Sequence, residues 1–251
     1  MTQKTNKTKI LFLDIENTPN LAYVWGKYEQ DVISFEKEWY MLSFAYKWLG
    51  DKKVSVISLP MFGGYNKQKT YDKSLLYELW NLLDDADIVI GHNVDRFDLR
   101  KINARFLFHG IKPPSPYKTV DTLKIARKYF FLNSNKLTHL GAYLGIGKKV
   151  STGGFDLWLQ CMSGDKNAWA KMEEYNKNDV VLTAKLYEKL KPWIFNHPNV
   201  NALTGVQDAC PKCGVKKLQR RGFSISGGNK KQRLQCVSCG GWSIGKTEKH
   251  E

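Results

Sequence analysis

The sequence has no apolar run that approaches the length of a transmembrane span, and no basic amphipathic helix that would bind a membrane surface. The basic N-terminus is not followed by a signal-peptide segment, because Asp14 interrupts the apolar residues that begin at Ile10. These absences exclude a membrane partner and predict a cytoplasmic protein. There is also no internal repeat and no low-complexity tract.

Acidic residues are scarce relative to basic ones. The 251 residues include 24 Asp and Glu against 39 Lys and Arg, which leaves a net charge of +15. Such an excess of positive charge favours a polyanionic partner, and nucleic acid is the most common one. With 42% hydrophobic and 25% charged residues, the composition is that of an ordinary globular protein. The length suffices for one domain of about 150 to 200 residues and a small appendage.

The apolar pattern predicts alternating strands and helices after a first strand at residues 10–13. Two β-rich runs within 38–59 flank a Gly-Asp turn, which predicts an antiparallel hairpin. The later predicted elements are a helix over 71–86 capped by Asp72, a buried strand over 86–93, a helix over 97–108, two helical pieces within 119–146 broken at 133–135, and a helix over 172–190 that ends before Pro192. This order predicts a layered α/β domain.

Acidic residues stand where this pattern predicts buried faces. Asp14 and Glu16 follow the first strand and share one of its faces, because side chains alternate along a strand. For this pair alone, a strand end that reaches solvent is the simpler interpretation. Two further segments weigh against it. Asp98 begins a predicted helix on its apolar face, and Asp179 lies within the apolar face of another predicted helix. Carboxylates that point inward from three segments favour a site with bound cations.

These motifs resemble a known family. The order Asp14-x-Glu16, then Asn93-x-x-x-Phe97-Asp98, then Tyr175-x-x-x-Asp179 is similar to the three motifs of the DEDD 3′-to-5′ exonucleases. That family includes the proofreading domains of DnaQ-like and family B DNA polymerases and has an RNase H-like fold. The resemblance covers residues 9–193, and Tyr175 is typical of the tyrosine (DEDDy) branch. It implies an RNase H-like mixed sheet flanked by helices, with antiparallel first strands and parallel later ones.

The resemblance also implies roles for these residues. Asp14, Glu16 and Asp179 would hold one Mg²⁺ or Mn²⁺, and Asp14 would bridge to a second ion that Asp98 helps to retain. Two such ions catalyse in-line phosphodiester hydrolysis, and hard oxygen ligands select these metals. Tyr175 would position the attacking water. Its alternative role is that of a packing aromatic.

Other residues near the motifs carry weaker predictions. Asn93 is predicted to bind the terminal nucleotide or to cap a helix, and Phe12 and Phe97 are predicted to pack near the terminal bases. Lys136 is a candidate substrate contact, as is Asp121, although surface ion pairs explain both equally well. His92 lies in the second motif and is interpreted as a structural histidine. Asp95 and Asp156 receive no role.

Four of the five cysteines lie in the last 42 residues. Cys210 and Cys213 form one C-x2-C pair, and Cys236 and Cys239 form another after 22 intervening residues. Four thiolates complete a tetrahedral Zn²⁺ shell, and the pattern resembles a zinc ribbon. An iron-sulfur cluster is the alternative. The fifth cysteine, Cys161, is interpreted as a buried thiol.

The sequence therefore predicts a 3′-to-5′ exonuclease domain over 1–195, a linker over 196–209 and a zinc ribbon over 210–251. Ten Lys or Arg oppose three acidic residues from residue 205 onward, which favours nucleic acid as the ligand of the ribbon over a replication partner. The leading hypothesis is an exonuclease acting on single-stranded DNA, alone or beside a DNA polymerase. The alternatives are an exoribonuclease and a non-catalytic nucleic-acid-binding or recruitment protein.

Overall fold

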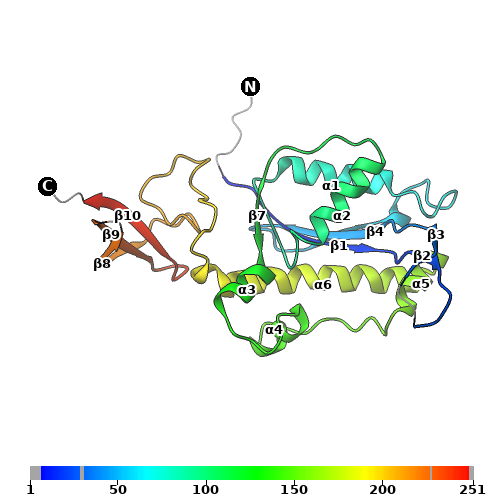
Figure 1. Ribbon diagram of the computed structural model, residues 1–251. Coiled ribbons are helices and arrows are strands. Elements are labelled where there is room, and N and C mark those ends of the chain that lie inside the picture. Colours follow the sequence, from blue (N-terminus) through cyan, green and yellow to red (C-terminus); the bar gives the residue numbers. More distant parts are fainter. Residues whose placement is uncertain (1–6, 29–30, 227, 249–251) are drawn as a thin grey trace, which may run out of the picture.

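The computed structural model describes residues 7–28, 31–226 and 228–248, and a five-stranded mixed sheet forms its centre (Figure 1). The strand order is β5-β4-β1-β6-β7. β1 pairs antiparallel with β4 and parallel with β6, while β5 is antiparallel to β4 and β7 is parallel to β6. The strands are β1 (Ile10–Asn17), β4 (Met41–Trp48), β5 (Ser55–Ser58), β6 (Ile88–Gly91) and β7 (Lys118–Asp121). The predicted mixed α/β sheet is confirmed.

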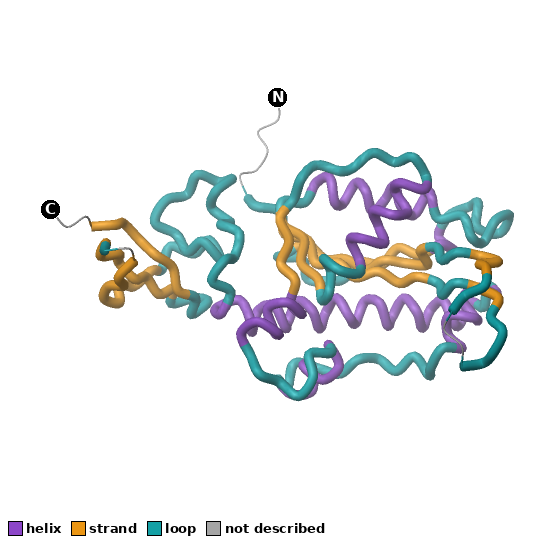
Figure 2. Tube along the Cα trace, in the orientation of Figure 1, coloured by secondary structure: helices purple, strands orange, loops and turns teal. Residues whose placement is uncertain are grey.

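Helices cover both faces of this sheet (Figures 1 and 2). α1 and α2 lie over one face, and the long α6 runs along the other with α3 and α4 beside it. The helices are α1 (Lys73–Asp85), α2 (Asp98–Phe108), α3 (Thr122–Tyr129), α4 (Leu137–Tyr143), α5 (Asp156–Ser163) and α6 (Lys166–Leu190). Two short 3₁₀ helices, η1 (Leu59–Met61) and η2 (Lys191–Trp193), complete them.

β1 separates two hydrophobic clusters, because its successive side chains point to opposite faces. Odd-numbered residues of β1 pack in the cluster that includes α1 and α2. The even-numbered Ile10 and Phe12 pack in the cluster that includes the second half of α6. Asp14 and Glu16 are the next even-numbered residues, so β1 aims both toward α6.

Phe12 lies inside this core, and the prediction that it packs near the terminal bases is wrong. Its side chain is only 2% exposed, and its ring meets Tyr187 edge-on with 5.6 Å between the ring centroids. The reason is its position in the strand. Phe12 lies two residues before Asp14, where α6 still covers β1. The Phe12 ring therefore has no open face for a base.

Some elements differ from the sequence prediction. Residues 118–121 form the edge strand β7, although the pattern predicts a helix from 119. The helix begins only after Asp121, because that carboxylate accepts hydrogen bonds from the backbone N–H groups of Leu123 and Lys124. The predicted break at 133–135 does separate α3 from α4. No prediction covered α5 or the small hairpin of β2 (Leu21–Tyr23) and β3 (Ser34–Lys37).

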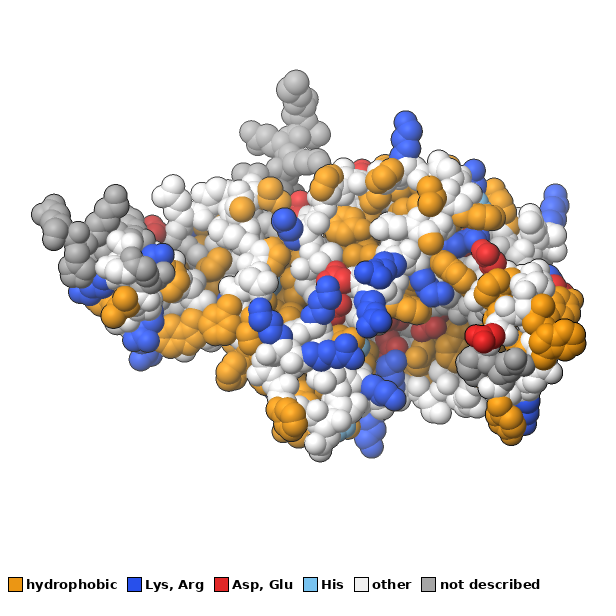
Figure 3. Space-filling model, viewed as in Figure 1, with side chains coloured by type: hydrophobic (Ala, Val, Ile, Leu, Met, Phe, Trp, Pro, Cys, Tyr) orange, Lys and Arg blue, Asp and Glu red, His pale blue; other side chains and the backbone are white. Residues whose placement is uncertain are grey.

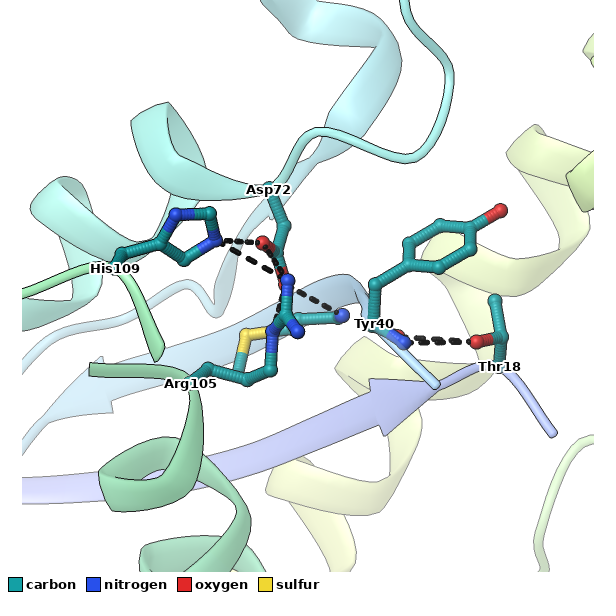
Figure 4. Close-up of polar contacts among 6 residues, drawn as sticks. Thr18, Tyr40, Asp72, Arg105 and His109 are labelled. Atoms are coloured by element: carbon teal, nitrogen blue, oxygen red, sulfur yellow. Dashed lines mark hydrogen bonds and ion pairs between the residues drawn. The ribbon is translucent and has the colours of Figure 1, made fainter. Parts of the chain in front are cut away.

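Asp72 stands at the N-cap of α1 as predicted, but its side chain does not cap the helix. Its fully buried carboxylate accepts hydrogen bonds from Arg105 Nε at 2.8 Å and Nη2 at 2.6 Å, and from the backbone N–H of Met41 at 2.9 Å (Figure 4). His109 Nε2 lies 2.7 Å from the same carboxylate. This cluster ties α1, α2 and β4 together through one buried ion pair.

We expect Asp72→Asn to lower the free energy of unfolding by about 3 to 5 kcal/mol, because it leaves the Arg105 guanidinium buried without its countercharge. Urea unfolding measures the change. Asp85→Asn is the matched control, because Asp85 pairs with Lys9 at an exposed position and its loss is expected to stay below about 1 kcal/mol. Equal effects of the two substitutions would contradict the prediction.

Beyond η2 the chain leads to a second, smaller sheet at the end of the molecule (Figure 1). Its antiparallel strands, in the order β10-β9-β8, are β8 (Leu218–Ser226), β9 (Asn229–Cys236) and β10 (Trp242–Glu248). The residues between the sheets pack back on the first one. Val200 is buried in the hydrophobic cluster that includes the second half of α6, and His197 Nε2 lies 2.8 Å from Tyr187 Oη. Across the described ranges, no helix has the length and apolarity needed to span a membrane.

Candidate active site

The carboxylates of Asp14, Glu16 and Asp179 meet beside the end of β1. One oxygen atom from each lies within 4.8 Å of those from the other two. Two of these residues come from β1, and the third comes from the inward face of α6. Figure 3 shows acidic side chains in a hollow, with Lys and Arg side chains gathered around it. Residues remote in the chain thus converge on one side of the sheet.

Asp98 joins this group from the first turn of α2. It is 3% exposed, and its Oδ1 accepts a hydrogen bond from the backbone N–H of Ile15 at 3.2 Å. That bond fixes the carboxylate against β1 between the two acidic residues of the strand. Ile102 and Phe106 are buried on the same helix face, as the sequence pattern predicts.

The carboxylates make one another harder to ionise. Burial raises the pKa of Asp14, and the charges of Asp98, Asp179 and Glu16 raise it further. Burial, followed by the charge of Asp179, raises the pKa of Glu16 to about 8. Burial raises the pKa of Asp98 to about 7. A cluster of this kind favours any cation that enters it, because a positive charge stabilises the ionised form of every member.

Lys149 supplies one such charge. Its Nζ donates hydrogen bonds to Asp179 Oδ2 at 2.5 Å and to Tyr175 Oη at 3.1 Å. Although burial lowers the pKa of this amine, the neighbouring Asp179 carboxylate outweighs burial and raises the pKa overall. Sequence analysis did not single out Lys149, because one lysine in the irregular segment between α4 and α5 carries no signal of its own.

Asn176 is a second residue that sequence analysis missed. It is fully buried, and its Nδ2 donates a hydrogen bond to Asp14 Oδ2 at 2.7 Å. Its Oδ1 accepts a hydrogen bond from Ser43 Oγ at 3.0 Å, which fixes the orientation of the amide. The available signal was its place on α6, three residues before Asp179 on the inward face. Asn176 therefore positions Asp14.

The donor set fits a hard divalent cation. The converging ligands are carboxylate oxygens, which Mg²⁺ and Mn²⁺ prefer. Within the described part of the chain, Asp179 Oδ1 is buried without a hydrogen-bond partner, whereas buried polar atoms are normally satisfied. A cation among Asp14, Glu16 and Asp179 would supply that partner and offset their mutual repulsion.

The sequence profile of the RNase H superfamily matches residues 11–191, a range that includes all four carboxylates and Tyr175. The chain belongs to the RNase H superfamily. Its fold is similar to that of a family B DNA polymerase from the hyperthermophilic archaeon Pyrobaculum calidifontis, with a TM-score of 0.56 and 17% sequence identity. That similarity covers 89% of this chain and 32% of the polymerase.

A shorter sequence similarity links the chain to Protein NEN3 of Arabidopsis thaliana. The two are 34% identical over 62 residues, which are 24% of this chain and 12% of NEN3. The chain therefore spans only a small part of the length of these larger relatives. At this identity, the similarity to the polymerase establishes the fold alone, and the superfamily rests on the profile match over residues 11–191.

Two of the predicted substrate residues line the hollow of the RNase H domain. Asn93 and Lys136 line the same hollow as Asp14 and Asp179. Asn93 adopts the left-handed conformation with φ 71°, which asparagine tolerates better than most residues. Phe97 is 43% exposed, and Lys101 Nζ lies 5.4 Å from the centre of its ring. The roles of Asn93, Lys136 and Phe97 remain predictions.

Asp121 and His92 organise loops of the RNase H domain, and His92 also lines the hollow. Asp121 is 4% exposed, and besides capping α3 it accepts a hydrogen bond from the N–H of Asn93 at 3.0 Å. His92 Nδ1 lies 2.9 Å from Thr122 Oγ1, and its Nε2 lies 3.0 Å from the carbonyl oxygen of Asn135. Burial lowers the pKa of His92. The interpretation of His92 as a structural histidine agrees with these contacts.

The four C-terminal cysteines form a separate cluster beyond the RNase H domain. Their sulfur atoms all lie within 4.8 Å of one another. Each C-x2-C pair forms a tight turn closed by a glycine, since Gly214 N–H donates to the Cys210 carbonyl and Gly240 N–H to the Cys236 carbonyl. Both glycines have positive φ, 75° and 71°. Four sulfurs in this arrangement fit a tetrahedral Zn²⁺ site.

Proposed function

We propose that this chain is a metal-dependent 3′-to-5′ exonuclease of the DEDDy type that hydrolyses single-stranded DNA in replication, repair or nucleic-acid degradation. The observation that carries the proposal is the convergence of Asp14, Glu16, Asp98 and Asp179 at the end of β1. Tyr175 stands beside this group, linked to Asp179 through Lys149. Membership of the RNase H superfamily supports the same chemistry.

In this proposal, Asp14, Glu16 and Asp179 would hold one Mg²⁺ or Mn²⁺, and Asp14 and Asp98 would hold a second. When bound, such ions stabilise the attacking and leaving oxygens of phosphodiester hydrolysis. Asn176 keeps Asp14 oriented for this task through its 2.7 Å hydrogen bond. The backbone N–H of Ile15 does the same for Asp98.

Tyr175 orients the attacking water. Burial, followed by the charges of Glu16 and Asp179, raises the pKa of its phenol to about 12. The phenol therefore stays protonated at neutral pH and holds the water by hydrogen bonding instead of accepting its proton. Lys149 Nζ donates a hydrogen bond to the phenol oxygen at 3.1 Å and so holds it in place.

Matched single strands of DNA and RNA, labelled at the 5′ end, test this function. With Mg²⁺ or Mn²⁺ we expect a descending ladder of 5′-labelled DNA products, because removal of nucleotides from the 3′ end leaves the label on the shortened strand. A 3′ label should appear as a mononucleotide from the first cut. Faster digestion of RNA would replace the proposed substrate with RNA. Binding without cleavage in either metal would refute the enzyme in favour of a binding protein.

The C-terminal region is part of the proposal. We propose that Cys210, Cys213, Cys236 and Cys239 hold one structural Zn²⁺, so that residues 210–251 form a zinc ribbon joined to the exonuclease domain (1–195) by a linker (196–209). The similarity to a polymerase that is much longer than this chain supports a DNA polymerase as a candidate partner.

A further inference from the structure

A groove of about 520 Å³ lies where the C-terminal sheet meets the segment after η2. Its lining includes Phe195 and, from β10, Trp242 and Ile244. Phe195 is 73% exposed and Trp242 is 39% exposed, so a ligand in the groove can reach both residues. The volume falls in the usual range of about 300 to 1,000 Å³ for ligand sites.

The groove carries positive charge next to both rings. Lys212 Nζ lies 5.9 Å from the ring centre of Phe195, and Arg233 Cζ lies 5.9 Å from that of Trp242. No acidic residue lines the groove in the described part of the chain. The sequence around it is strongly basic, with ten Lys or Arg against three acidic residues from position 205 onward. Lys212 is buried and its Nζ already donates a hydrogen bond to the Pro192 carbonyl oxygen at 2.8 Å, so Arg233 is the cation that a ligand in the groove would meet. A polyanion with flat rings would pair with Arg233 and stack on the rings, whereas an apolar peptide would offer Arg233 no countercharge.

α3 connects this groove with the acidic hollow. Arg127 lines the hollow that contains Asp14 and Asp179, and Lys128 lines the next hollow together with Asn196. The ring of Tyr129 contacts Phe195, with 5.7 Å between their centroids. Three consecutive residues of α3 therefore lead from the carboxylates to the groove.

The distance between the carboxylates and the groove also suits a single strand of nucleic acid. Along α6, the rise from Asp179 to the end of the helix at Leu190 is about 16 Å at 1.5 Å per residue, and the groove lies beyond that end. A strand whose 3′ end reached the carboxylates would need several nucleotides to cover this distance. A very short oligonucleotide would occupy the hollow alone.

We propose that the groove between Phe195 and β10 binds single-stranded nucleic acid, with bases stacked on Phe195 and Trp242 and a phosphate paired with Arg233. On the proposed function, this strand is the substrate, held several nucleotides upstream of the 3′ end that is cut. The groove supplies affinity for longer strands, and the carboxylates supply the chemistry.

Fluorescence anisotropy with 5′-labelled dT20 and dT4 tests the groove, using the full zinc-loaded chain with Ca²⁺ in place of Mg²⁺ to prevent turnover. We expect dT20 to bind far more tightly than dT4, and Phe195→Ala to weaken dT20 binding about tenfold, as for loss of one stacked base. Arg233→Gln should reduce the slope of log K against log salt by about one. Phe195 lies outside the C-terminal sheet, so its effect does not depend on the folding of that sheet.

Tyr77→Ala is the matched control. Tyr77 is 49% exposed on α1, across the sheet from α6, and it also has a lysine near its ring, with Lys73 Nζ at 6.0 Å. This substitution should leave dT20 affinity unchanged. If Phe195→Ala binds dT20 within twofold of wild type while wild type still digests DNA, the groove is refuted and the proposed nuclease stands. If dT20 binding depends on Phe195 but wild type cleaves nothing, the nuclease is refuted and the groove stands.

Discussion

Asp14→Asn is expected to abolish hydrolysis, with a fall in kcat of about a thousandfold or more at saturating Mg²⁺. Asp14 interacts electrostatically with all three other carboxylates, because the charges of Asp98, Asp179 and Glu16 each raise its pKa. Its loss removes a ligand shared by both proposed ions, whose stabilisation of the transition state amounts to several kcal/mol, and each 1.36 kcal/mol is a factor of ten in rate. Single-turnover digestion of labelled DNA measures the change.

The same substitution should not unfold the protein. In the absence of metal, an uncharged side chain relieves repulsion among the carboxylates, so the Tm of Asp14→Asn should equal or exceed that of wild type. Asp51→Asn, in the exposed turn between β4 and β5, is the control for loss of one negative charge and should retain full activity. Residual activity of Asp14→Asn above a few per cent of wild type would contradict the assigned role.

Loss of zinc should unfold the C-terminal sheet. Among the described side chains of β8 to β10 few are buried, whereas Cys210 and Cys236 of the cysteine cluster are both 1% exposed. Structural Zn²⁺ contributes roughly 10 to 16 kcal/mol in small domains of this kind. We expect one Zn²⁺ per chain by metal analysis, and its removal by Cys236→Ser should expose residues from 210 onward to limited proteolysis while the RNase H domain and the segment packed on it stay protected.

Ser238→Ala is the control for this second prediction. Ser238 is an exposed residue of the same C-x2-C turn, so its substitution should leave zinc content and protease resistance unchanged. Iron with visible absorbance in place of zinc would show that the cysteines hold an iron-sulfur cluster instead. Protease resistance that survives complete removal of the metal would contradict a structural role for the ion.

The sequence by itself determined the elements that carry the chemistry. Alternation along one strand is a local property, so it places Asp14 and Glu16 on one face without knowledge of the fold. Helical spacing likewise aligns Tyr175 with Asp179. The C-x2-C turns bring their own two sulfurs together through local backbone geometry, and the structure adds only the meeting of the two turns.

Only the tertiary structure decided which remote side chains meet these residues. Lys149 reaches Asp179 and Asn176 orients Asp14 through contacts that depend on how α6 and the segment before it pack on the sheet. Tertiary packing also explains why Asp72 does not cap its helix. The buried Arg105 guanidinium gives the Asp72 carboxylate a stronger interaction than the helix N-terminus does. Local sequence fixes the direction of a side chain relative to its own strand or helix, whereas burial and partners follow from long-range packing, which no short motif encodes.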